Sequence, residues 1–206
     1  MYSQVEICNL ALDCFGSGHI VSINEDTEPA NLLRNVWDSC RRSLLAKGWW
    51  NFATTYTELS ETADTVYHPY WQHIYAYPTK CIRVMNVYSV APELLDKYYE
   101  RTFEVFLSGE RRYIGCNIAD AKAQAVYDVE NTALYPPEFV TCLAYYLASR
   151  VCEALTRNGQ IVQEMNAQYE KILMDAQLTN ARERMERTQY PDAYLRFRNG
   201  RTGGWR

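Results

Sequence analysis

The chain of 206 residues is 48% hydrophobic and 22% charged, which is enough apolar material for a core that needs no disulfide or metal to stabilise it. Its seven Cys are odd in number, scattered and free of CxxC pairs, which argues against a disulfide framework and a zinc knuckle. Glu6 and Asp13 interrupt the first apolar stretch, and no apolar run approaches the roughly 20 residues that a membrane span needs. We therefore expect reduced thiols, no signal peptide, no membrane and no cofactor.

The formal net charge of −4 is unevenly distributed. Residues 182–206 hold seven Arg against three acidic residues, whereas residues 1–181 hold 14 Lys and Arg against 22 Asp and Glu. The acidic body argues against a nucleic-acid clamp, and the basic tail is the predicted contact element.

Two amphipathic helices are predicted before residue 49. In the segment 2–15, one face is formed by Ile7, Leu10, Ala11 and Cys14, and the glycines of "GSGH" end the helix. The second helix follows "EDTEPA", where Pro29 is tolerated in the first turn. Its apolar stripe consists of Leu33, Trp37, Cys40 and Leu44, and Gly48 ends it.

Strands are predicted between residues 49 and 135. "CIRVMNVYSV" alternates and is rich in β-branched residues, and "TFEVFLSGERRYIGC" indicates two strands around a Ser-Gly-Glu turn. "AKAQAVYDV" also alternates, but its Ala content leaves a helix open there.

Helical period returns at "YPPEF" and continues in two further helices. The third has a face of Val140, Leu143, Leu147, Val151 and Ala154, and "RNGQ" is a tight connection that turns the chain back. The fourth carries Val162, Met165, Tyr169, Ile172 and Ala176 on a 3-4 spacing. Beyond Thr179 the stripe is lost, and Pro191 ends the helical pattern.

These elements predict an α+β fold: an antiparallel four-helix bundle with a β-rich domain inserted between its second and third helices, plus an extended C-terminal tail. The expected boundaries are 1–48 for helices 1 and 2, 49–135 for the β-rich insert, 136–190 for helices 3 and 4, and 191–206 for a flexible tail.

Motifs for catalysis and cofactor binding are absent from the sequence. There is no GxGxxG, no GxxxxGK[ST] and no GxSxG, and the Pro in "YHPYWQH" makes a helical metal pair from His68 and His73 a poor candidate. We expect no enzyme, no catalytic residue and no metal site.

Two aromatic features exceed what a bland globular domain requires. One is "KGWWNFA", where Trp49 and Trp50 mark either a ligand-stacking site or a structural hinge. In a strand, Trp50 and Phe52 share one face and are expected to seal the β-insert onto the bundle, which leaves Trp49 as a bundle cap or subunit contact.

The other feature is the tail, in which aromatic residues alternate with Arg. Its candidate contact residues are Tyr194, Arg196, Phe197, Arg198, Arg201, Trp205 and Arg206. Such a pattern is typical of protein hot spots and of stacking on single-stranded bases, and an untethered terminus is the third alternative.

Four segments, in order and spacing, resemble the head-to-tail adaptor (tail tubular protein A) family of short-tailed bacteriophages. They are "ICNLALDCFG", the Trp-Asn-Phe-Ala box at residues 50–53, "YAYPTKCIRV" and "YPPEFVTCLAYYLASRVCEALT". The matching residues of the last two are Tyr75, Tyr77, Pro78, Cys81 and Arg83, then Pro136, Phe139, Leu147 and Ala148. Lys80 stands where the family usually has an acid, and Trp49 is an additional aromatic.

The resemblance implies a structural virion protein of the tail or neck, synthesised in the bacterial host cytoplasm. Its partners would be further copies of itself in a ring of twelve, the portal protein, the tail nozzle protein and the double-stranded DNA that passes through. The Arg-rich tail has no template in the family, and we expect it to dock on the portal with Phe197 and Trp205 as anchors. The alternative is a nucleic-acid-binding module that acts through the same tail.

Overall fold

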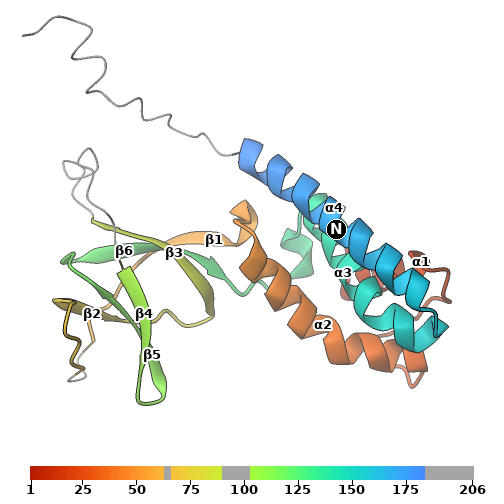
Figure 1. The fold of residues 1–206 in the computed structure, drawn as a ribbon, viewed down its shortest axis with the longest axis horizontal. Coiled ribbons are helices and arrows are strands. Elements are labelled where there is room, and N and C mark those ends of the chain that lie inside the picture. Colours follow the sequence, from red (N-terminus) through yellow and green to blue (C-terminus); the bar gives the residue numbers. More distant parts are fainter. Residues whose placement is uncertain (63–65, 90–102, 184–206) are drawn as a thin grey trace, which may run out of the picture.

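The computed structural model describes residues 1–62, 66–89 and 103–183. The helices lie at one end of an elongated molecule and the strands at the other (Figure 1). The helices are α1 (Gln4–Asp13), α2 (Glu28–Lys47), α3 (Pro137–Thr156) and α4 (Gly159–Arg182), each within a predicted helical segment.

Local sequence signals explain where these helices begin and end. Ser3 and Glu6 form a capping box at the start of α1, and prolines occupy the first turns of α2 and α3. Arg157, at φ 52°, adopts the left-handed conformation that ends α3 and turns the chain into α4.

The predicted four-helix bundle with an inserted β-domain is wrong. Helix α3 lies in the centre and packs closely against α1, α2 and α4, whereas the backbones of the other described helix pairs approach each other at few positions. The reason is visible in α3, which buries ten of its 20 residues all around its axis, including Phe139, Cys142 and Cys152, which lie outside the predicted stripe. A helix that is apolar on every side belongs in the middle of a core rather than at one corner of a bundle.

The predicted face of α1 is also displaced around the helix. Leu10 is 38% exposed and Cys14 is half-buried, while Cys8 and Leu12 are fully buried. The stripe of α2 is correct, and Arg41 lies buried beside it.

The strands form two antiparallel sheets of three strands each. The first has the order β1 (Thr54–Glu58), β6 (Ala121–Tyr127), β3 (Cys81–Ser89), and the second has the order β2 (His73–Ala76), β5 (Arg111–Cys116), β4 (Phe103–Ser108). The segment "AKAQAVYDV", whose Ala content is also compatible with a helix, contains β6, the central strand of the first sheet. Gly109, at φ 60°, supplies the turn between β4 and β5.

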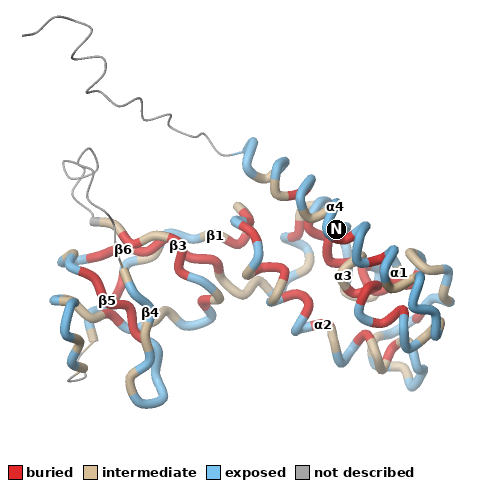
Figure 2. The backbone as a smooth tube through the Cα atoms, viewed as in Figure 1, coloured by how far each residue is buried: buried red, intermediate tan, exposed pale blue. Residues whose placement is uncertain are grey.

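The first sheet contributes to two hydrophobic cores, because side chains alternate between its faces. On β6, Ala123 and Ala125 pack into a core shared with Tyr75 and Ile114 of the second sheet, whereas Val126 packs into the core of the helices. Met85 of β3 also belongs to the core of the helices, and buried segments lie both among the helices and along this sheet (Figure 2). The strands are thus joined to the helices by shared packing.

Candidate functional site

The Trp49–Trp50 junction connects α2 to β1. Helix α2 ends at Lys47, Gly48 follows in an extended conformation, and Asn51–Ala53 form a single 3₁₀ turn. The alternating strand geometry predicted for Trp50 and Phe52 is therefore replaced by a tight turn.

Trp50 lies in the core. Its side chain is 1% exposed, and its Nε1 donates a hydrogen bond of 2.9 Å to the Leu44 carbonyl at the end of α2. The indole packs edge-on against Phe139 with 4.9 Å between ring centroids, and Phe52 lies 4.9 Å from the same ring. The junction thus joins the strands to α3 through aromatic packing.

Gly48 is required by the position of Trp50. A Cβ built on Gly48 would lie 2.5 Å from Trp50 Nε1 and 2.7 Å from its Cε2. The indole cannot move away without losing its hydrogen bond to Leu44, so the backbone and the ring must pass each other at a distance that only glycine allows.

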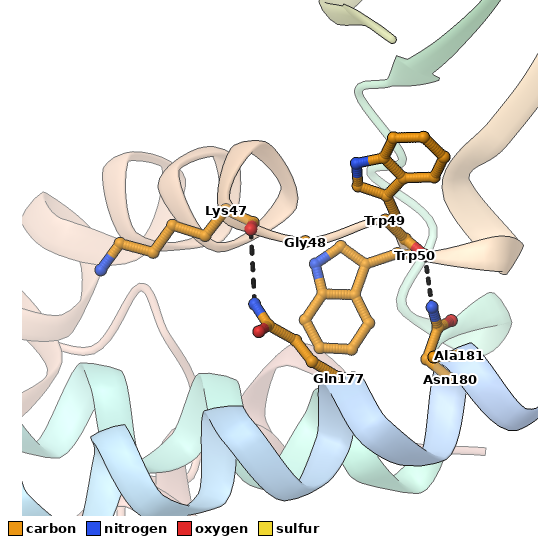
Figure 3. A pocket seen from close by; sticks show the side chains of 7 residues that line it. All are labelled: Lys47, Gly48, Trp49, Trp50, Gln177, Asn180 and Ala181. Carbon is orange, nitrogen blue, oxygen red and sulfur yellow. Dashed lines mark hydrogen bonds between the residues drawn. The ribbon is translucent and has the colours of Figure 1, made fainter.

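Side-chain amides hold the end of α4 over this junction (Figure 3). Asn180 donates to the carbonyl of Trp49, and the side chain of Asn51 donates to the carbonyl of Asn180 at 2.9 Å. The backbone N–H of Asn51 also donates to Asn180 Oδ1 at 2.9 Å, and Gln177 Nε2 donates to the Lys47 carbonyl at 3.3 Å. Polar contacts rather than apolar packing therefore fix the last turns of α4.

A hollow of about 320 Å³ remains between the junction and α4. It is lined by Lys47, Gly48, Trp49, Trp50, Gln177, Asn180 and Ala181. The rings of Trp49 and Trp50 point in different directions, and Trp49 is 41% exposed at the edge (Figure 3). The lining of this hollow contains no carboxylate, thiol or imidazole.

Lys47 is held by aromatic rings. Its Nζ lies 5.0 Å from the ring centroid of Tyr146 and 5.1 Å from that of Tyr169, and it donates to the Tyr169 hydroxyl at 3.2 Å. Burial, with a smaller contribution from Tyr146, raises the pKa of Tyr169 above its ordinary value. The phenol therefore stays neutral and accepts from the ammonium group.

Arg41 forms a buried ionic contact between α2 and the segment after β6. It is 3% exposed and donates to Asp128, to the Val129 carbonyl at 2.9 Å and to Asp38 at 3.2 Å. Burial acts to lower the pKa of Arg41, but the hydrogen bond and charge of Asp128 outweigh it, and the pKa is raised. The pair fixes how the first sheet meets the helices.

The thiols are structural. Six of the seven Cys are buried, and burial raises the pKa of Cys8 and Cys142 to about 12 and that of Cys40 to about 11. His68 and His73 each face a glutamate, Glu104 at 3.5 Å and Glu61 at 3.1 Å. The described residues contain no cluster of three or more His, Cys, Asp or Glu arranged to hold a metal ion.

The predicted tail contacts, Tyr194, Arg196, Phe197, Arg198, Arg201, Trp205 and Arg206, lie outside the described residues. Sequence reasoning missed Asn180 and Asp128, which lie 129 and 87 positions from their partners Asn51 and Arg41. Pairing of residues so far apart in the chain leaves no local pattern in the sequence.

Within the described ranges, no helix has the length and apolarity to cross a membrane.

Comparison with protein-family models and with curated proteins finds no match for this chain.

Proposed function

We propose that this chain is a structural virion protein of a short-tailed bacteriophage, a head-to-tail adaptor that assembles into a ring of twelve copies beneath the portal. The ring carries the tail nozzle protein on its other side and forms part of the channel through which double-stranded DNA leaves the particle. The chain acts by assembly rather than catalysis.

The observation that supports this most directly is the convergence of the segments that carry the family resemblance. Trp50 and Phe52 from one segment meet Phe139 from another in one aromatic cluster. Arg83, from a third segment, donates to the Ala46 carbonyl at the end of α2 at 3.3 Å. Matching residues from three of the four segments thus lie close together at the junction between α2, α3 and the strands. This proximity favours a real family relationship over a chance match.

The distribution of charge supports the same role. Residues 1–181 carry 22 acidic residues against 14 basic ones, so a ring of such bodies surrounds the DNA with negative charge. Repulsion of the phosphates limits adhesion while DNA moves through the channel. The basic tail, whose anchors we propose to be Phe197 and Trp205, docks on acidic side chains of the portal.

The decisive experiment locates the chain in particles. Mass spectrometry of purified virions should detect it at twelve copies per portal ring, and the full-length chain should bind an isolated portal ring but bind DNA only weakly at physiological salt. Absence from virions, or salt-dependent binding of single-stranded DNA that is lost on truncation after Tyr190, would instead favour the nucleic-acid-binding module.

A further inference from the structure

A basic hollow lies between α2 and the turn that joins β2 to β3. Its volume is about 580 Å³, and four cations line it: Arg42 from α2, Lys80 from the turn, and Arg111 and Arg112 from the start of β5. Glu61 is the one acidic residue in its lining, and this carboxylate faces His73 at 3.1 Å. Basic side chains from α2, from the β2–β3 turn and from β5 therefore line one hollow on a protein whose net charge is negative.

The cations of this basic hollow have local partners that a stronger partner could replace. Arg42 lies 3.4 Å from Asp128 and Lys80 lies 3.6 Å from Glu130, but the side chains of Arg42 and Lys80 are 62% and 73% exposed. Ion pairs this exposed contribute little to stability. Arg112 stacks on Tyr77 with 4.1 Å between its guanidinium carbon and the ring centroid, which orients its charge without neutralising it.

Exposed apolar residues lie beside the basic hollow on the β4–β5 hairpin. Val105 is 41% exposed and Leu107 is 67% exposed. Leu107 pairs directly with Arg112 across the two strands, so both side chains lie on the same face of the sheet. A partner that binds here therefore meets positive charge and apolar surface together.

The outward side of α4 has the complementary composition. This helix buries only Met165, Tyr169 and Ala176 of its 24 residues. Met174 and Leu178 are 65% and 58% exposed, one turn apart. Exposed acidic residues flank them, namely Glu164, Glu170 and Asp175, with Lys171 as the one cation between positions 164 and 178.

We infer that the basic hollow binds the outward side of α4 from a second copy of this chain. Arg42 and Lys80 in the basic hollow and Met174 and Leu178 on α4 are all exposed in the single chain, so the two surfaces do not cover each other within one copy. Contact between two different surfaces of identical chains is head-to-tail, and it closes into a ring or continues as a filament. The ring form rests on the proposed function, and the contact itself rests on the complementary charge and apolar surface.

A nucleic-acid backbone fits the basic hollow less well. Asp38, Asp128 and Glu130 line the neighbouring depression on α2, which shares Arg42 with the basic hollow. These carboxylates repel a phosphate backbone that extends past the basic hollow. A phosphate backbone also leaves Val105 and Leu107 without an apolar partner, which Met174 and Leu178 supply.

Zero-length crosslinking tests the contact on the full-length chain. A carbodiimide joins an amine to a carboxylate only when the two touch, and a mixture of ¹⁵N-labelled and unlabelled chains separates crosslinks between copies from those within one. We expect mixed-label crosslinks from Lys80 to Glu170 or Asp175 that increase with protein concentration. The within-chain pair Lys122–Glu58, at 2.8 Å, is the positive control. Control crosslinks without any mixed-label product at Lys80 would overturn the inference.

A charge swap gives an independent answer. K80E/R112E and E170K/D175K should each weaken self-association by about tenfold or more in sedimentation velocity, because like charges then face each other. Mixing the two variants should restore association in which the two kinds of chain alternate at a one-to-one ratio, and combining all four changes in one chain should restore self-association. A misfolded variant could not regain association in this way.

Failure of both rescues would overturn the inference. So would a K80E/R112E variant that loses DNA binding but keeps its self-association. If rings occur in virions while the swap has no effect, the interface is wrong and the proposed adaptor stands. If the chain is absent from virions, the adaptor is wrong, whatever the crosslinks show.

Discussion

The indole of Trp50 packs edge-on against Phe139, with 4.9 Å between centroids of rings that are 89 positions apart in the chain. This contact connects the turn that leads into the first sheet with the central helix α3. Because Phe52 and Tyr135 also touch Phe139, at 4.9 and 4.9 Å, one cluster links the start and the end of the strand region.

Trp50→Ala should lower the free energy of unfolding by about 3 to 5 kcal/mol, since it removes a buried indole and leaves a cavity. Trp49→Ala is the matched control, and it should cost less than about 1 kcal/mol because Trp49 is 41% exposed. Urea denaturation of both variants measures the difference. Equal effects of the two substitutions would mean that Trp50 is not the core residue of this junction.

Gly48→Ala should destabilise the protein by about 1 to 3 kcal/mol through steric conflict with the Trp50 indole. Gly18→Ala is the control, because a Cβ at Gly18 meets no atom within 4 Å. In the Trp50→Ala background the cost of Gly48→Ala should largely disappear, which a double-mutant cycle detects. An unchanged cost in that background would place the conflict elsewhere.

The helices on either side of this junction can be predicted from the sequence, but their contacts with each other cannot. Helix α2 could be predicted down to its buried stripe, because its apolar residues recur on one side only. The sequence predicts where α3 lies along the chain but not its central position in the fold, since residues such as Cys142 and Ala148 lie outside a single stripe. A single stripe on α3 predicts a helix at one corner of a bundle, whereas the buried residues lie on several sides of it.

The amide contacts of the candidate site could not be predicted at all. Asn51 lies in the Trp-Asn-Phe-Ala segment, but nothing near Asn180 in the sequence indicates that it would accept from the Asn51 backbone and donate to Trp49. The 3₁₀ turn at residues 51–53 was missed for a similar reason: tertiary packing of Trp50 and Phe52 on Phe139 overrides the alternation that a strand would give.

Asp128→Asn should lower the free energy of unfolding by about 3 kcal/mol, because the buried guanidinium of Arg41 is then left with Asp38, whose side chain is 78% exposed, as its remaining counter-charge. Glu58→Gln is the matched control, since Glu58 and Lys122 form an ion pair in which the glutamate side chain is 80% exposed. We expect no measurable change in the urea midpoint for that control. A comparable loss in both variants would argue against a special role for the buried pair.

The buried thiols predict a loss of stability at high pH. Unfolded Cys ionises near its ordinary pKa of 9.0, whereas burial keeps Cys8 and Cys142 protonated until about pH 12. Their contribution is therefore complete below pH 9 and declines as the pH rises from there towards 12. The free energy of unfolding should fall between pH 8 and 10.5, and Cys142→Ala should reduce that slope even if it lowers stability at both values.

Thiol labelling tests independently whether the thiols are buried in the native state, as the predicted pH dependence of the free energy of unfolding requires. Because the thiolate is the reactive form, a disulfide reagent at pH 8 should modify the half-buried Cys14 first and all seven thiols only after unfolding. Cys14→Ala should remove the fast phase. Rapid labelling of several native thiols would show that the core opens more readily than its packing indicates.

Truncation after Tyr190 should leave a folded protein that cannot join portal-containing particles. Among the described residues, Ala176 is the last in the buried core, and the contacts of Asn51 with Asn180 and Glu183 are retained in the truncated chain. Circular dichroism and urea denaturation should therefore match the full-length chain, while binding to an isolated portal ring is lost. Phe197→Ala/Trp205→Ala should reproduce that loss if the aromatic residues are the anchors, whereas Arg196→Gln/Arg198→Gln should instead weaken the dependence of binding on salt. Normal incorporation of the truncated chain into particles would exclude the tail as the portal contact, and the contact would then have to lie within residues 1–190.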